Sequence, residues 1–514
     1  MSTVTETSVG GPTAAGVETA NGYITGFGSV GYRSYVLTVL LFIYILNFVD
    51  RALLSVVARP LKADLGIGDT AFGLLTGFGF ALLYSVLGVP IARLAETRHR
   101  VWIMAICLAL WSLMTALCGL SQEIVIGSLS IGAFWVLLTC RIGVGIGEAG
   151  CTPPANSLIA DYYPPSKRST ALGYYAMGVN LGTAISNLIG GPITDMFDWR
   201  VAFFVLGLPG VAVAILLKVT VKEPPRGYTD PPGAVKSERA ALSAAIKELL
   251  SKPSFWLMTV GATLAAFCGY AIASFQSLYL QRTFDLSAGQ AAVNFNVPAY
   301  VASALGTVFI GWLAERMSRR DETAIAWMPA VGLIACVPVY WWAFTTNSQM
   351  YCLIALTLAG FMKYGYLAAQ YTIGQGVASL RVRATAIAVM LFVINLLGYG
   401  FGPLFAGVVS DIFFRGSLAD AGLTGVVTRP MCDAAQEAVN VASRSAQAPL
   451  SATDISPILT GLDQPLTDAQ FAFCNAANAS STETSMLFTT SIYALAGLFF
   501  LLCARFYKRD LVAR

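Results

Sequence analysis

Long apolar runs separated by short polar connections dominate the sequence. Stretches of about 20 mainly apolar residues recur, and a helix of that length crosses a hydrocarbon layer of roughly 30 Å. The pattern predicts twelve membrane-spanning helices, at residues 35–57, 71–94, 101–120, 129–157, 168–192, 199–218, 254–280, 289–313, 324–346, 349–376, 383–410 and 485–507. The glycines and prolines inside these runs are compatible with spanning helices, because neighbouring helices and water satisfy the freed backbone groups.

Composition supports a multi-pass integral membrane protein. Hydrophobic residues make up 56% of the chain and charged residues only 12%, which excludes an ordinary soluble domain. Of the 32 Lys and Arg, 22 fall in connections on one side of the predicted spans and 7 on the other. Since cytoplasmic connections carry the excess of basic residues, we expect both termini in the cytoplasm and no nucleic-acid partner.

The connections between spans set the predicted domain organisation. The parts are a disordered cytoplasmic tail at 1–34, a six-helix half at 35–218, a cytoplasmic linker at 219–253, a second six-helix half at 254–507 and a cytoplasmic tail at 508–514. Within the linker, Leu242, Ile246, Leu249 and Leu250 have helical spacing. This spacing predicts a short amphipathic helix on the membrane surface or against the bundle.

An internal repeat of roughly 215 residues relates the two halves. L-A-E-T-R-H-R at 94–100 follows the second span, and L-A-E-R-M-S-R at 313–319 follows the eighth. The start of the fifth span, R-S-T-A at Arg168, recurs as R-A-T-A at Arg383. Two halves with the same helix order imply parallel repeats about an axis along the membrane normal, with a binding site between them.

Four charged residues interrupt the apolar runs of the first half. Asp50 and Arg51 lie within the first span, and Arg141 and Glu148 within the fourth. Charges at this depth are costly unless they face a partner or a water-filled cavity, and they usually mark a substrate or ion pathway. Asp50 and Arg51 are adjacent and cannot pair with each other on a helix, so each needs another partner.

The chemistry of these four side chains suggests two roles. An acid can gain or lose a proton, whereas Arg stays charged throughout. We therefore expect Glu148 or Asp50 to carry the proton and Arg51 or Arg141 to bind an anion. The alternative is a static buried network that stabilises the first half.

The loops after the second and eighth spans share a motif. G-W-L-A-E-R-M-S-R-R at 311–320 keeps most of G-x-L-A-D-R-x-G-R-R, the signature of the major facilitator superfamily, and 92–100 keeps less of it. The chain resembles that superfamily over nearly its whole length, which implies an all-α integral membrane fold of two pseudo-symmetric six-helix halves. The resemblance also implies that motif residues hold one access state closed, namely Glu96, Arg100, Glu315, Arg316 and Arg319.

Within the superfamily the chain is similar to bacterial members of the Spinster group. The similarity rests on N-F-V-D-R at 47–51 and R-I-G-V-G-I-G-E-A at 141–149. Members of that group are associated with lipid export, and the similarity implies amphipathic anionic lipids as one substrate class, such as a lysophospholipid or a sphingoid phosphate, with the direction of transport left open. Asn47 joins the substrate-binding candidates, although a polar residue of this kind more often bonds a neighbouring helix.

The second half contributes one buried cation. Lys363 lies near the middle of the tenth span, with Tyr366 and Gln370 on the same helix face. Lys363 is too deep to reach the membrane surface comfortably. We weigh two roles for it equally, a substrate contact and one half of an ion pair.

Two cysteines fall outside the spans. Cys432 and Cys474 lie in the 411–484 connection, which the basic-residue count places on the outer side. Because an oxidising compartment permits disulfides, we expect a bridge between them, with two free thiols as the alternative.

No catalytic or metal-binding pattern is evident in the spans. The only histidine, His99, falls in a loop, and an enzyme at membrane depth would need a nucleophile and base or several metal ligands. We expect no enzyme activity, no cofactor and no metal.

These features predict a proton-coupled secondary transporter of an amphipathic anionic lipid that works by alternating access. The alternatives are a porter of a small organic anion such as a carboxylate, a facilitator without proton coupling, and a membrane sensor that keeps the fold without transporting. We expect a monomer in a bacterial inner membrane, with substrate, protons and membrane lipids as its partners.

Overall fold

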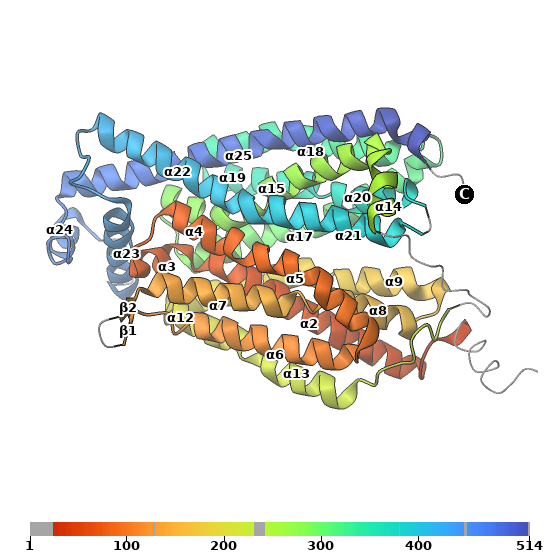
Figure 1. Ribbon diagram of the computed structural model, residues 1–514. Coiled ribbons are helices and arrows are strands. Elements are labelled where there is room, and N and C mark those ends of the chain that lie inside the picture. Colours follow the sequence, from red (N-terminus) through yellow and green to blue (C-terminus); the bar gives the residue numbers. More distant parts are fainter. Residues whose placement is uncertain (1–23, 127–128, 231–241, 380, 447–449, 512–514) are drawn as a thin grey trace, which may run out of the picture.

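The computed structural model describes residues 24–511 except 127–128, 231–241, 380 and 447–449. Residues 1–23 of the predicted tail at 1–34, part of the linker and the last three residues lie outside this described range. The described chain is a bundle of long helices in two halves (Figure 1).

The first half contains the following elements in chain order: α2 (Val30–Val56), α3 (Ala58–Leu65), α4 (Asp69–Thr76), α5 (Phe78–Thr97), α6 (Arg100–Cys118), β1 (Ile124–Ile126), β2 (Leu129–Ile131), α7 (Ala133–Glu148), α8 (Thr152–Tyr162), α9 (Pro165–Ala176), α10 (Gly178–Ile185), the π-helical segment η1 (Ser186–Gly190), α11 (Gly191–Met196), α12 (Trp199–Gly207) and α13 (Pro209–Thr220). β1 and β2 form a short antiparallel hairpin with Val125 opposite Ser130.

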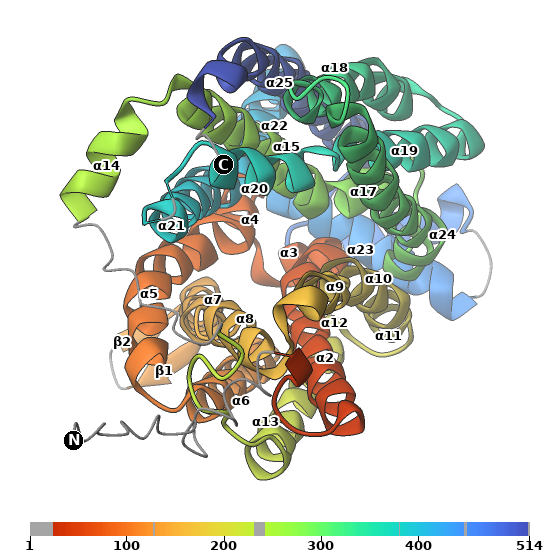
Figure 2. The same ribbon diagram turned by 90° about the vertical axis from the view of Figure 1, so that its right-hand side faces the viewer.

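The second half is preceded by α14 (Leu242–Leu250), which follows the linker. Its own elements are α15 (Pro253–Thr283), α16 (Ala288–Gln290), η2 (Ala291–Asn296), α17 (Val297–Ser318), α18 (Ala324–Thr345), α19 (Gln349–Lys363), α20 (Tyr366–Gly376), α21 (Arg383–Val393), η3 (Ile394–Tyr399), α22 (Gly400–Asp420), α23 (Arg429–Ala446), α24 (Ala452–Thr460) and α25 (Asp468–Asp510). Figure 2 shows the two halves facing each other, with α14 projecting away from the bundle.

Eleven helices in the described range are long and apolar enough to cross a membrane. The predicted fifth span is not among them, and Pro165–Met196 forms α9, α10, η1 and α11. Helix ends also differ from the prediction. The first helix begins at Val30, within the predicted tail, and the last extends to Asp510.

The predicted outer connection at 411–484 is shorter than the apolar pattern indicated. Helix α22 continues to Asp420 and α25 begins at Asp468, so both long helices extend beyond their apolar sections. Between them α23 and α24 form a small unit, which we call the cap and define as residues 421–467. It lies at one end of the bundle, the cap end, opposite the end where α25 finishes (Figure 1).

The two halves pack most closely near the cap end. A Cβ atom added at Gly73 on α4 would collide with the backbone of Pro403 on α22, and one added at Gly407 would collide with the backbone of Asp69. Only glycine permits this approach of two helix backbones. The cap end is therefore closed by direct contact between the halves.

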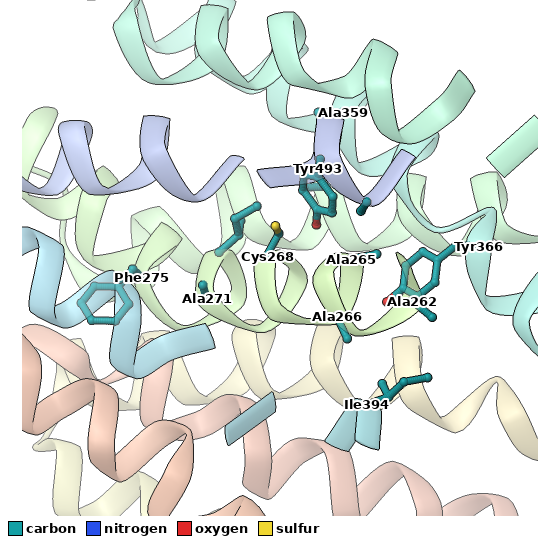
Figure 3. Packing of buried hydrophobic residues seen from close by; sticks show 14 of the residues in the cluster. Ala262, Ala265, Ala266, Cys268, Ala271, Phe275, Ala359, Tyr366, Ile394 and Tyr493 are labelled. Atoms are coloured by element: carbon teal, nitrogen blue, oxygen red, sulfur yellow. The ribbon is translucent and has the colours of Figure 1, made fainter. Parts of the chain in front are cut away.

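Small residues also bring helices together in the second half. Ala262, Ala265, Ala266, Cys268 and Ala271 on α15 are buried against neighbouring helices (Figure 3). Close-packed interiors require such complementary volumes. This packing fixes the positions of Tyr366 and Ile394, which reach the cavity described below.

Candidate functional site

The predicted charges of the first half lie on two facing helices. Arg51 on α2 donates from Nε to Glu148 Oε2 on α7, at 2.5 Å, and the Glu148 side chain is fully buried. Gly145 brings α7 close to α5, which carries the rings next to Arg51, since a Cβ at Gly145 would lie 2.7 Å from the Phe80 carbonyl oxygen. The structure thus provides the partner that Arg51 requires.

Aromatic rings surround the Arg51 guanidinium. Its Cζ lies 4.9 Å from the ring centroid of Phe48, 4.8 Å from Phe80 and 4.7 Å from Tyr84. A fourth ring, Tyr399 of the second half, lies 5.8 Å away. Because ring faces attract cations, this arrangement holds Arg51 at the boundary between the two halves.

Asp50 on α2 and Arg141 on α7 lie close together but form no salt bridge. Arg141 Nη1 is 3.4 Å from the backbone oxygen of Asp50. Asp50 Oδ1 and the Arg141 atoms Nε and Nη2 are buried and make no hydrogen bond within the described residues. The four charges are therefore not a fully satisfied network.

A cavity of about 470 Å³ lies between the halves. Arg51, Tyr366 and Gln370 line it, whereas Asn47, Asp50, Arg141, Glu148 and Lys363 do not. Eight tyrosines contribute to its wall: Tyr44, Tyr84, Tyr270, Tyr300, Tyr364, Tyr366, Tyr371 and Tyr399. The cavity thus combines apolar ring surface with hydroxyl groups and one guanidinium.

Each π-helical segment presents an asparagine to this cavity, namely Asn187 from η1, Asn296 from η2 and Asn395 from η3. Asn296 donates to Asn187 Oδ1 at 3.0 Å and accepts from Gln276 at 2.8 Å. This chain of amides joins the two halves at the cavity wall. Such π-helical segments occur frequently at functional sites.

Lys363 lies where the tenth span is interrupted. Helix α19 ends at Lys363, and α20 begins at Tyr366. The Lys363 side chain is buried, with Nζ 4.9 Å from the ring centroid of Tyr364 and 5.5 Å from that of Tyr340. No acid among the described residues pairs with it, so the structure offers no support for the ion-pair role.

A buried ion cluster closes the cap end. Asp69 of the first half binds Arg282 of the second, with 2.8 Å between Oδ2 and Nη1. Asp433 of the cap binds both Arg282 Nη2 at 2.9 Å and Lys62 Nζ at 2.6 Å. Lys62 and Arg429 also pair with Asp69. Three separate parts of the chain therefore meet in one cluster.

Electrostatics favour the ionised form of Asp433. Burial alone would raise its pKa, but Arg282 and Lys62 outweigh that effect and hold the pKa of Asp433 below its ordinary value. An acid with several cations and hydrogen-bond donors around it stays charged.

Helix α23 makes further contacts outside the ion cluster. Glu437 accepts from Arg59 at 3.2 Å, and Arg444 donates to Asp195 at 3.0 Å, so the cap binds the first half at two more places. Cys432 and Cys474 form a disulfide, with 5.2 Å between their Cα atoms. The disulfide attaches α23 to α25 one residue before Asp433.

The motif residues at the opposite end behave differently in the two halves. Arg100 is buried and binds Asp161 at 2.5 Å and Glu223 at 2.6 Å, so it joins neighbouring segments. Glu315 and Arg319 are exposed and lie 3.7 Å apart on one helix. Arg316 stacks on Trp312 and Glu96 is exposed. The Arg100 contacts join segments in the way that the motif predicts.

Sequence reasoning missed most of the cavity wall and the cap-end cluster. Tyr270 and Asn395 line the cavity, although nothing in the sequence distinguishes them from other polar residues of the spans. Asp69 falls just before an apolar run and gave no signal. The described residues contain no group of three or more His, Cys, Asp or Glu that could hold a metal ion.

Comparisons with known proteins agree with the fold. Residues 40–403 match the Major Facilitator Superfamily. The chain is 33% identical over 372 residues to an MFS-type efflux pump of Mycolicibacterium smegmatis, covering 71% of this chain and 82% of that protein. It is 26% identical over 493 residues to Protein spinster of Drosophila melanogaster, covering 93% of this chain and 77% of that protein.

Among solved structures, the chain resembles a bacterial homolog to the human lysosomal transporter Spinster, in an inward-facing and unoccupied conformation. The TM-score is 0.80 at 36% identity, over 95% of this chain and 100% of that chain. An inward-facing and occupied structure gives a TM-score of 0.77 at 35% identity.

Proposed function

The chain belongs to the major facilitator superfamily, in its Spinster group, and on that basis we propose that it transports an amphipathic anionic lipid by alternating access, driven by protons. The observation that carries this proposal is the ion pair between Arg51 and Glu148 at the cavity wall. A lysophospholipid or a sphingoid phosphate is the expected substrate class.

Proton coupling follows from competition for Arg51. While Glu148 is ionised, its Oε2 binds Nε of the Arg51 guanidinium at 2.5 Å. A proton on Glu148 removes that negative charge and leaves Arg51 free to bind a carboxylate or phosphate in the cavity. Asp50 is the second carrier candidate, because its buried Oδ1 has no donor among the described residues.

The cavity wall supports an amphipathic substrate. Eight tyrosines offer ring surface for an apolar chain and hydroxyl groups for a polar headgroup. The volume of about 470 Å³ lies within the usual range for ligand sites. The names of two relatives, an efflux pump and a lysosomal transporter homolog, also agree with movement of a substrate across a membrane.

Alternating access requires a closed end and an accessible end. Contact between the halves near Gly73 and the ion cluster around Asp69 close the cap end. Similarity to inward-facing structures supports an inward-facing state for this chain. The cap would then lie outside the cell, with both termini in the cytoplasm of a bacterium and the protein acting as a monomer.

A labelling experiment tests this orientation. Thr453 on α24 and Glu322, before α18, are both exposed and lie toward opposite ends of the bundle. We expect Thr453→Cys to react with a membrane-impermeant thiol reagent on intact cells, and Glu322→Cys to react only after the membrane is broken. The reverse pattern would place the cap in the cytoplasm.

Transport in proteoliposomes tests the function. Lysophospholipids, sphingoid phosphates and small carboxylates are compared with and without a pH gradient. We expect gradient-dependent movement of a single-chain anionic lipid. Gradient-dependent movement of carboxylates alone would favour a small-anion porter. Equal movement with and without a gradient would favour a facilitator, and binding of a ligand without its movement would favour a sensor.

A further inference from the structure

The structure leaves Lys363 as a buried cation without a counter-ion. Its side chain is 5% exposed, and none of the described residues accepts a hydrogen bond from its ammonium or forms an ion pair with it. The cation contacts only the rings of Tyr340 and Tyr364. An unpaired charge at membrane depth is costly and is a sign of function.

Lys363 lies next to the cavity. Tyr364, whose ring centroid is 4.9 Å from Lys363 Nζ, also lines the cavity, as does Tyr366. The regular helix is interrupted at this point, since α19 stops at Lys363 and α20 starts at Tyr366. Interrupted helices near the middle of the membrane form substrate and ion sites in transporters. A turn of the Tyr364 side chain would open the ammonium to the cavity.

Gln370 adds a second unsatisfied group in the second half, and unlike Lys363 it lines the cavity. It is 3% exposed, it lines the cavity from α20, and its Oε1 makes no hydrogen bond within the described residues. The wall of the second half therefore has polar groups that its own structure does not use.

Charge balance indicates the ligand. Away from the helix ends, the spans carry three cations, Arg51, Arg141 and Lys363, against two acids, Asp50 and Glu148. This leaves one positive charge, and a proton on either acid leaves two. A phosphate monoester carries about 1.5 to 2 negative charges near pH 7 and would neutralise that excess.

We propose that Lys363 is a second anion-binding residue, in the half opposite Arg51, and that it makes the cavity selective for dianionic phosphate monoesters over monoanions. The lipid class of the ligand rests on the proposed function, whereas the preference for a dianion does not. The alternative is a purely structural role, in which Lys363 stabilises the C-terminal end of α19, where a cation is favourable.

The test compares two ligands that differ by about one charge, a single-chain alkyl phosphate and its methyl ester, binding to the protein in nanodiscs of zwitterionic lipid at about pH 7. We expect Lys363→Gln to weaken binding of the monoester about tenfold or more and binding of the methyl ester by less than about threefold. Lys363→Arg should restore the preference. Lys218→Gln is the matched control, because Lys218 stacks on Trp102 in α6 and lies away from the cavity.

Phenyl phosphate separates this inference from the lipid proposal. If neither alkyl ester binds but phenyl phosphate binds and depends on Lys363, the lipid substrate is wrong and the second anion site stands. Equal loss of both esters in Lys363→Gln, with a lower unfolding temperature, would assign Lys363 to the helix end. Unchanged binding of all three ligands, or no binding of any, would overturn the anion site.

Discussion

At the scale of single residues, the structure divides four buried charges into two unlike pairs. Arg51 and Glu148 form a direct ion pair that borders the cavity, whereas Asp50 and Arg141 meet only through a backbone oxygen. Coupling and recognition therefore depend on the first pair more directly than on the second.

The first prediction concerns Glu148. Glu148→Gln imitates the protonated acid, so gradient-driven accumulation should be lost while exchange of substrate between the two sides persists. Transport in proteoliposomes with and without a pH gradient measures both. Full gradient-driven accumulation by this variant would exclude Glu148 as the carrier, and Asp50→Asn tests the other candidate in the same assay.

The second prediction concerns Arg51. A lysine keeps the charge but not the planar donors that bind Glu148 and stack among Phe80, Tyr84 and Tyr399. We expect Arg51→Lys to weaken substrate binding about tenfold. Arg141→Lys is the control, because Arg141 does not line the cavity and its replacement should lower the unfolding temperature more than the affinity. Equal affinities of Arg51→Lys and the wild type would contradict the role of Arg51.

At the scale of elements, α23 is the unit that joins the halves. Its side chains reach Lys62, Arg59 and Asp195 in the first half and Arg282 in the second. The cap shares an apolar core with the ends of α22 and α25, which includes Phe414, Leu418, Val427, Leu459 and Leu466. The disulfide between Cys432 and Cys474 lies within that core.

The third prediction concerns this disulfide. Its cysteines are 42 residues apart, and closing a loop of that size contributes about 4 kcal/mol by the chain-entropy argument. Cys432→Ser should make the cap susceptible to proteolysis and should affect the stability of the cap more than the rate of transport. Limited proteolysis beside a transport assay measures both effects, with Cys107→Ser as the control. Free alkylation of both thiols in unreduced cells would show that no disulfide forms.

At the scale of the whole molecule, the cavity and the cap-end cluster are two parts of one cycle. The cap end must open for substrate to leave or enter on that side, and opening separates Asp69 and Lys62 of the first half from Arg282 of the second. Buried ion pairs of this kind are costly to break one partner at a time. The closed end is therefore the state that the charges stabilise.

The fourth prediction concerns the pH dependence of this closure. The pKa of Asp433 is lowered in the closed state. Its contribution to the stability of the closed state is therefore fully present above about pH 3.9, the ordinary pKa of an aspartate. This contribution is lost as the pH falls through the lowered pKa. We expect the distance between spin labels at Val125 and Gln349 to stay constant between about pH 5 and 8 in Glu148→Gln. Widening near pH 6 in that variant would show that the cluster itself is the proton sensor.

The sequence by itself determined the helical membrane fold, the repeat of two halves and the positions of the buried charges. Apolar length and the cost of charge in hydrocarbon act locally, so they can be seen without knowing which helices meet. The pairing of Cys432 with Cys474 was also predicted, because few cysteines lie outside the spans.

Only the tertiary structure decided the partners. Glu148 binds Arg51 and not Arg141, since the choice depends on how α2 and α7 face each other. Asp69, Arg282 and Asp433 lie far apart in the sequence and meet because two halves and the cap converge at one end. The tyrosines of the cavity look like ordinary apolar residues of a span until the packing shows which helix faces enclose space.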